Sequence, residues 1–261
     1  MRFGILLGLC LFLAGPSFAN DNLRQLLSLD TAKIWRGVGL LVIGDNSTCT
    51  GALIAEDQVL TAAHCVLDAE TGKKLDPRDI KFYAGWRLGG AGSIRNGRRI
   101  AVAKNYRGLG DNPQAKLIAI ANDLAILELD QRVDAAIIQP FALSERVNGG
   151  QQVSIVSYAR GRNEAPSIED ECSILRRLVH VLMMDCSVDF GASGSPVFVM
   201  DNGVPKIASV VSAMGNEDGE TYAFGMQLRK LVGTIQADLA QDSTVFQGKK
   251  PGQSLADQLG R

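Results

Sequence analysis

The chain contains two histidines, and they lie in very different settings. His64 lies in the segment Thr61–Cys65 (TAAHC), where small neighbours leave room for a substrate and the adjacent cysteine could anchor the backbone. His180 lies in the alternating run Leu178–Leu182, a pattern that predicts a strand residue facing solvent. Because histidine exchanges a proton near neutral pH, His64 is the candidate general base.

A serine flanked by glycines supplies a candidate nucleophile. Ser193 lies in the segment Phe190–Pro196 (FGASGSP). Glycine on both sides permits backbone conformations that other residues avoid. The N–H groups of Gly191 and Ser193 could therefore point to one spot and form an oxyanion hole. Such Gly/Ser turns are also common in loops, so this segment predicts chemistry only together with other groups.

The carboxylate that could orient the base is Asp123, in the segment Asn122–Leu127 (NDLAIL). An Asp before a strand is often a turn former. Here an apolar run follows at once and would hold the carboxylate at the edge of a core, within reach of one ring nitrogen of His64. With Ser193 as nucleophile, these groups predict acyl transfer through an acyl-enzyme, which requires no cofactor and no metal.

Many short strands must position these groups. Gly, Asn, Asp and Pro separate the apolar or alternating runs, as in an all-β sandwich or barrel. A polar stretch, residues 133–150, separates two sets of runs and predicts a linker. Apolar residues at three- and four-residue steps predict a helix over residues 228–240, and the polar tail 241–261 is predicted to be disordered. The first set of predicted strands is Val38–Ile43, Ala52–Ala55, Gln58–Ala62, Ile80–Gly85, Ile100–Lys104 and Leu124–Leu129, and the second is Gln152–Ala159, Leu175–Met184, Pro196–Met200, Ile207–Ala213 and Thr221–Gly225.

The N-terminal residues 1–19 predict a secretory signal peptide, with Arg2 before a short apolar run and a small-x-small cleavage site ending at Ala19. An exported protein, secreted or periplasmic, meets an oxidising compartment that favours disulfides. Four cysteines follow Ala19 and allow three pairings. Their short spacings favour Cys49–Cys65 and Cys172–Cys186, and no pair has the close spacing of a metal site.

Charge is nearly balanced, with 27 basic and 28 acidic residues and a net charge of −1. Such a balance predicts no attraction to nucleic acid or to an anionic membrane. After signal cleavage no stable membrane insertion is expected. The predicted partners are protein or peptide substrates, and nothing in the sequence indicates an oligomeric state.

Taken together, the motifs Thr61–Cys65, Asn122–Leu127 and Gly191–Pro196 resemble the trypsin-like serine peptidases of the chymotrypsin fold, which keep the order His, Asp, Ser along the chain. The resemblance extends over residues 36–240. Asp185-Cys186 before Ser193 and Gly-Ser-Pro after it are similar to the bacterial V8-like, glutamyl-endopeptidase branch.

This resemblance implies two antiparallel Greek-key β-barrels with the active site between them, plus a C-terminal helix. The first barrel would span residues 36–132 and carry His64 and Asp123, and the second would span residues 151–227 and carry Ser193. Residues 20–35 form an N-terminal segment before the first barrel. A disulfide between Cys49 and Cys65 beside the catalytic histidine is likewise implied.

The sequence also departs from the family pattern. Ala192 stands where zymogen-type members have an Asp that pairs with a newly cleaved N-terminus, so activity is expected to need no such terminus. Ser187 stands where trypsins have the acid that binds Arg or Lys. Val188 and Val211 stand where glutamyl endopeptidases hold a substrate carboxylate.

These departures predict a primary substrate pocket for an uncharged, small or medium apolar side chain, because burying an unpaired substrate charge is costly. Asp189, at a neighbouring offset, is the carboxylate that could reverse this preference. The predicted pocket residues are Ser187, Val188, Val211, Ser212 and Met214.

Two classes of function compete for this sequence, an active endopeptidase and a catalytically silent homologue that binds proteins. Silent relatives usually lose a residue of the triad, and all three are present here. An esterase of the α/β-hydrolase type needs Gly-x-Ser-x-Gly with the histidine after the serine, the reverse of the order found here.

Overall fold

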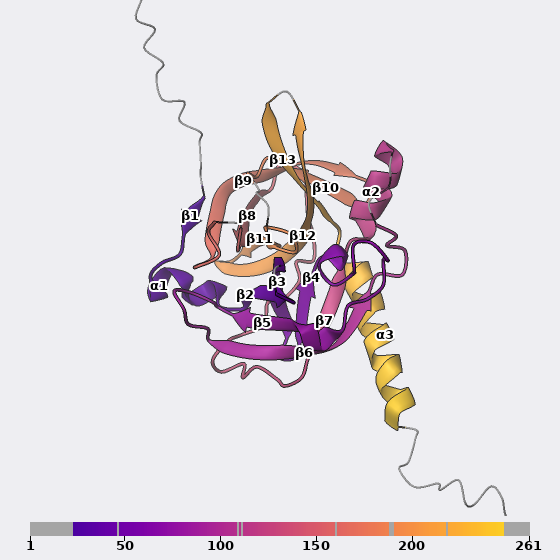
Figure 1. The fold of residues 1–261 in the computed structure, drawn as a ribbon. Coiled ribbons are helices and arrows are strands. Elements are labelled where there is room, and N and C mark those ends of the chain that lie inside the picture. The colour runs from indigo at the N-terminus through magenta and orange to yellow at the C-terminus, as the bar shows by residue number, and fades with distance from the viewer. Residues whose placement is uncertain are drawn as a thin grey trace, which may run out of the picture.

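Two closed antiparallel barrels of six strands each make up most of the molecule (Figure 1). The computed structural model describes residues 23–45, 47–108, 110, 112–159, 161–187, 191–217 and 219–247. The predicted signal peptide lies outside them. The first barrel contains β2 (Val38–Ile43), β3 (Ser47–Ala55), β4 (Gln58–Thr61), β5 (Ile80–Ala84), β6 (Ser93–Val102) and β7 (Ala125–Leu129). The second contains β8 (Gln152–Ser157), β9 (Ser167–Leu178), β10 (Val181–Met184), β11 (Pro196–Asp201), β12 (Val204–Glu217) and β13 (Glu220–Met226).

Both barrels have the same connectivity. The first closes in the order β2-β3-β4-β7-β6-β5, with β5 pairing back to β2. The second closes in the order β8-β9-β10-β13-β12-β11, with β11 pairing back to β8. Closure leaves no free sheet edge within either barrel. The predicted all-β fold of two barrels with a C-terminal helix is confirmed.

The core is divided between the barrels and the interface that joins them. Phe82 and Leu127 fill the first barrel, and Leu182 and Val197 fill the second. A third apolar cluster spans the interface, where the ring of Phe198 lies 4.9 Å from that of Trp35 and 4.7 Å from that of Phe141. Three elements distant in sequence thus bury large rings against each other, and this fixes one barrel relative to the other.

The N-terminal segment runs onto the second barrel before the chain enters the first. β1 (Arg24–Gln25) adds to the edge of β9, and Leu26 behind it is 1% exposed. The short helices α1 (Leu29–Ala32) and η1 (Lys33–Trp35) follow, with Ser28 capping α1. The N-terminal segment therefore packs on the second barrel and leads directly into the first.

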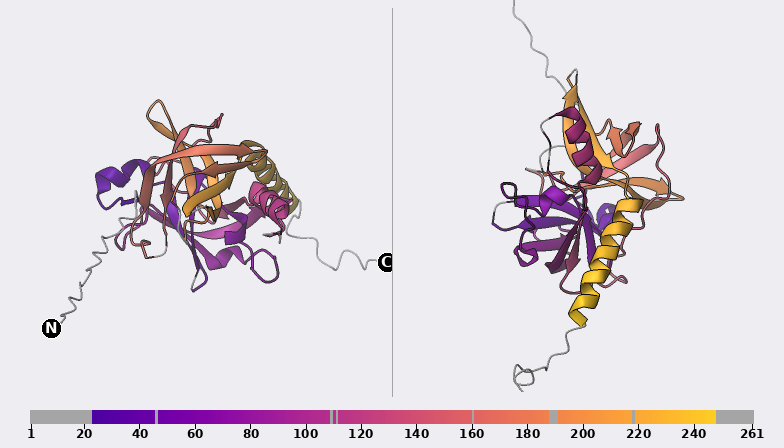
Figure 2. Two further views of the ribbon diagram at one scale, coloured as in Figure 1. Left: turned by 90° about the horizontal axis from the view of Figure 1, so that it is seen from above. Right: turned by 90° about the vertical axis from the view of Figure 1, so that its right-hand side faces the viewer.

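The C-terminal helix α3 (Arg229–Gln247) packs against β6 and β7 of the first barrel (Figure 2). It extends beyond the predicted end at Ala240, into the segment predicted to be disordered, because no glycine or proline lies between Ala240 and Gly248 to end it. Glu128 of β7 is buried beside Arg99 of β6, whose guanidinium also donates to the carbonyl of Leu239. No helix within the described residues is both long and apolar enough to cross a membrane.

Two further features were not expected from the sequence. Helix α2 (Pro113–Asn122) lies against β10 and β13 of the second barrel, and Asn112 caps its N-terminus. The predicted strand Leu175–Met184 is two strands, because Val179 adopts a positive φ of 55° and turns the chain. The strand placement of His180 was therefore wrong, and this exposed residue lies in the turn between β9 and β10.

Candidate active site

His64 is held by a covalent link to the first barrel. It lies in the 3-10 helix η2 (Ala63–Cys65), directly after β4. The disulfide Cys49–Cys65 joins this turn to β3, as the spacing predicted, and the second predicted pair, Cys172–Cys186, is also present. The imidazole is 34% exposed, so one edge of the ring is open to solvent.

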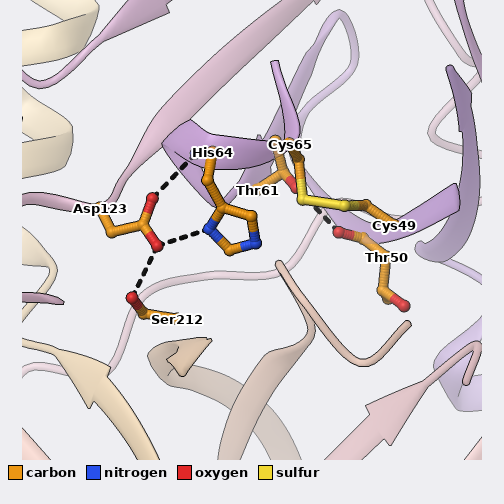
Figure 3. A network of polar contacts seen from close by, with 7 residues as sticks. All are labelled: Cys49, Thr50, Thr61, His64, Cys65, Asp123 and Ser212. Atoms are coloured by element: carbon orange, nitrogen blue, oxygen red, sulfur yellow. Dashed lines mark hydrogen bonds and ion pairs between the residues drawn. A yellow bond between two sulfur atoms is a disulfide. The ribbon is translucent and has the colours of Figure 1, made fainter. Parts of the chain in front are cut away.

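Asp123 holds the other edge of the His64 ring. It follows the last residue of α2, and its side chain is 3% exposed. Its Oδ1 accepts the backbone N–H of His64 at 2.9 Å, and its Oδ2 lies 2.7 Å from His64 Nδ1 (Figure 3). The hydroxyl of Ser212 donates to the same Oδ2 at 2.6 Å. Because an ionised carboxylate only accepts hydrogen bonds, Nδ1 carries the proton and Nε2 is left as a proton acceptor.

Ser193 is brought to this pair by a tight turn. The N–H of Ser195 donates to the carbonyl of Ala192 at 3.0 Å, and the N–H of Gly194 donates to the carbonyl of Val211 at 2.9 Å. Gly191 and Gly194 adopt φ values of +96° and +77°, which L side chains rarely adopt. A Cβ atom on Gly194 would lie 2.2 Å from Thr61 Oγ1 and 2.3 Å from the Thr50 carbonyl oxygen. The turn therefore packs against β3 and β4, next to the Cys49–Cys65 disulfide.

Thr50 connects this turn to both barrels. Its N–H donates to the carbonyl of Ser193 at 2.9 Å, and its Oγ1 accepts the N–H of Tyr158 at 2.9 Å. Its carbonyl accepts the hydroxyl of Thr61 at 2.9 Å. One buried residue next to Cys49 thus fixes the serine turn against the segment that carries His64.

The serine turn also distinguishes the two serines of the Gly191–Ser195 segment (GASGS). Ser193 is partly exposed, whereas Ser195 is fully buried and its hydroxyl makes no hydrogen bond within the described part of the chain. The N–H groups of Gly191 and Ser193 also donate to no described residue. No hydrogen bond joins His64 to the Ser193 hydroxyl, a contact that often tightens only when substrate binds.

The family model for the trypsin-like peptidase domain matches residues 49–204, which include all three groups. The chain belongs to the trypsin-like peptidase family. A structure of Glu endopeptidase superposes with a TM-score of 0.69 at 19% identity, over 85% of this chain and 98% of that one. Serine protease SP24D of Anopheles gambiae is 34% identical over 122 residues. That match spans 46% of this chain and 40% of the mosquito protein.

The predicted substrate pocket of this trypsin-like domain is placed in part. Val211 is 3% exposed and is bonded through its backbone to Gly194 and Ser195, so it supports the serine turn. Met214 is 40% exposed on β12. Ser187 precedes the turn, while Val188 and Asp189 lie outside the described residues.

Ser212, which was predicted to line the substrate pocket, has its side chain turned to Asp123. It is 7% exposed, and its hydroxyl is directed to Asp123. The backbone of Ser212 remains next to the serine turn through Val211, but its side chain positions the carboxylate. Its contact with a residue of the other barrel leaves no pattern in the sequence.

Two further groups escaped the sequence analysis. Tyr106 is 8% exposed near Asp123, and burial, with the charge of that carboxylate, raises the pKa of its phenol and keeps it neutral. Glu169 on β9 is 3% exposed, and its Oε1 accepts the N–H of Ser187 at 3.0 Å. A buried carboxylate thus lies directly behind the first residue of the predicted pocket.

Proposed function

We propose that the protein is a serine endopeptidase that hydrolyses peptide bonds through an acyl-enzyme. The observation that carries this proposal is the pair formed by His64 and Asp123, with Nδ1 and Oδ2 2.7 Å apart, together with the partly exposed Ser193 held against β3. Family membership and the fold shared with Glu endopeptidase support it. All three groups of the proposed triad are retained, so a purely binding role has no observation in its favour.

In this mechanism Nε2 of His64 takes the proton from the Ser193 hydroxyl as Oγ attacks the substrate carbonyl carbon. The oxyanion that forms accepts hydrogen bonds from the N–H groups of Gly191 and Ser193. Protonated His64 then gives its proton to the leaving amine, and the acyl-enzyme forms. Water, deprotonated by His64, then attacks the acyl carbon; the bond from that carbon to Ser193 Oγ breaks, His64 returns the proton to Oγ, and the acid product is released. Asp123 keeps the proton on Nδ1 throughout and stabilises the imidazolium.

The proposed setting is outside the cytoplasm. Two disulfides in a chain of this size fit an oxidising compartment, in agreement with the predicted signal peptide. Each disulfide lies within one barrel, and none joins the two barrels in the described part of the chain. We therefore expect the peptidase to act as an exported protein on protein or peptide substrates.

The primary pocket is proposed to take an uncharged side chain of small or medium size. Glu169 is the group that could contradict this proposal, because its buried carboxylate lies behind Ser187 and would attract a basic substrate side chain. Its Oε1, however, already accepts the Ser187 N–H. Cleavage of a peptide library would show the preference. A dominant Arg or Lys signal that disappears in Glu169→Gln or Asp189→Asn would show that a carboxylate reaches the pocket, and a dominant Glu signal would show a missed carboxylate-binding group.

The decisive test of activity is covalent labelling with a peptide phosphonate directed at serine. Intact mass should show one adduct, and peptide mapping should place it on Ser193. Ser193→Ala should abolish both labelling and peptidase activity, whereas Ser195→Ala should label normally. Normal peptidase activity in Ser193→Ala would refute the proposal, and a well-folded protein that neither labels nor cleaves would indicate the silent homologue.

A further inference from the structure

A cavity of about 880 Å³ lies away from the triad, bordered by the inter-barrel linker, the turn between β9 and β10, the end of α2 and the start of α3. Helices α2 and α3 lie on the side of the molecule that faces the viewer in the right panel of Figure 2. Five basic residues line it and one acidic residue does. The basic residues are Lys104, Arg146, Arg177, Arg229 and Lys230, and the acidic residue is Glu145.

This concentration of charge is unusual for this chain, in which 27 basic residues face 28 acidic ones overall. Ion pairs within the described residues neutralise little of the positive charge in the cavity. Lys104 pairs with the partly exposed Asp238 at 2.8 Å, and Arg229 lies 3.9 Å from Glu145 in an exposed contact. Arg146, Arg177 and Lys230 have no carboxylate within 4.0 Å in the part of the chain that the structure describes.

The start of α3 adds to the positive potential. Residues 228–231 line the cavity, and the helix continues to Gln247. Peptide dipoles aligned along such a helix place about half an elementary positive charge at its first turn. The cavity therefore attracts anions through side chains from four separate segments and through the backbone.

The lining also includes apolar groups. Val147 and Leu231 are partly exposed, and Leu228 and Ile235 are buried beneath them. A bare anion or a sulfated sugar presents no aliphatic group to such a surface. A peptide segment in which Asp or Glu alternates with apolar residues matches both the charge and the apolar contacts.

We propose that this basic cavity, defined by Arg146, Arg177, Arg229 and Lys230, is a docking site for an acidic segment of a protein substrate. Asn122 lines the cavity and directly precedes Asp123, the buried partner of His64, so the cavity lies on the side of the candidate active site behind the His64 ring. A protein substrate, unlike a short peptide, is long enough to contact both the cavity and Ser193. The docking role rests on the proposed peptidase function, whereas binding to the cavity does not.

Binding is tested first, in full-length Ser193→Ala protein so that no probe is cleaved. The probe is a fluorescent peptide of alternating acidic and leucine residues, with the matching Asn/Gln peptide as control. Fluorescence anisotropy should show binding that weakens with added salt, which screens charges over about 10 Å at 0.1 M. Arg146→Gln, Arg177→Gln and Lys230→Gln together should weaken binding by about tenfold, as expected for three exposed charge pairs.

A matched triple variant removes the same charge elsewhere on the surface. Lys33→Gln, Lys73→Gln and Arg176→Gln alter exposed residues outside the cavity, and Arg176 is the strand neighbour of Arg177. Binding should change less than about twofold in this control. Equal losses in the two triple variants would overturn the proposal, as would binding only to a sulfated polysaccharide or to anionic lipid vesicles.

The docking role is tested with the active enzyme and two substrates, a short neutral peptide and the same peptide extended by the acidic segment. The extension should lower KM with kcat unchanged, and the cavity triple variant should remove this advantage. Equal KM values in the unmodified enzyme would refute docking. Binding without cleavage of either peptide would refute the peptidase function and leave the cavity site standing.

Discussion

Asp123→Asn isolates the role of the buried carboxylate in setting the His64 tautomer. The carboxamide has one acceptor oxygen and one donor nitrogen. If the nitrogen took the Oδ1 position, it would face the N–H of His64 at 2.9 Å, donor against donor. The oxygen therefore remains there, and the nitrogen faces His64 Nδ1 and the Ser212 hydroxyl. We expect the ring to accept at Nδ1, which moves its proton to Nε2 and leaves no base for Ser193.

The magnitude follows from the same geometry. Loss of a unit charge beside the imidazolium costs about 4 kcal/mol at a separation near 4 Å and an effective dielectric constant near 20. That cost corresponds to a factor of about 10³ in rate, and the wrong tautomer raises the loss toward about 10⁴ in triads of this kind. We expect kcat to fall by this amount with KM nearly unchanged, because the carboxylate acts on the transition state.

The assay combines steady-state kinetics with nitrogen NMR of the imidazoles. With two histidines in the chain, and His180 exposed in a turn, the spectra are simple to assign. Asp123→Asn should change the protonated nitrogen of His64 alone. Ser212→Ala is the control, since it removes one hydrogen-bond donor to Asp123 but keeps the carboxylate charge and the His64 tautomer. It should lower the free energy of unfolding by about 1–3 kcal/mol. A kcat within about tenfold of the unmodified enzyme in Asp123→Asn, or an unchanged His64 tautomer, would refute this reasoning.

Two further predictions concern the structure that supports the site. Thr50→Val should lower the free energy of unfolding by about 1–3 kcal/mol in chemical denaturation, because the buried N–H of Tyr158 loses its acceptor; Thr50→Ser keeps the hydroxyl, and an equal loss there would implicate the methyl group instead. Chains that begin at Leu23 or earlier should be equally active, whereas a chain that begins at Leu27 should keep its kcat but unfold at lower temperature, because it loses β1 and about 1.5–3 kcal/mol from burial of Leu26. If only one processed form is active, and acetylating its N-terminus inactivates it, an ion pair at that terminus orders the site after all.

The sequence alone was sufficient for the groups whose signals are local. The continuous apolar run Val38–Ile43 is a property of the strand's own residues, so this strand could be predicted. The pairing of Cys49 with Cys65 followed from a separation of 16 residues. Asn112-Pro113, a capping residue followed by a first-turn proline, is also a local signal and marks the start of α2.

Only the tertiary structure decided what depends on the packing of one barrel against the other. The contact of Ser212 with Asp123 spans 89 residues, and that of Tyr158 with Thr50 spans 108. Nothing near either residue in sequence indicates such a partner, because the register between barrels arises from the aromatic cluster at their interface. The same packing leaves Ser193 accessible and buries Ser195, and it collects cations from four segments of a nearly neutral chain into one cavity. Periodicity and spacing report short-range geometry, whereas burial and electrostatic potential are sums over residues that meet only when the chain has folded.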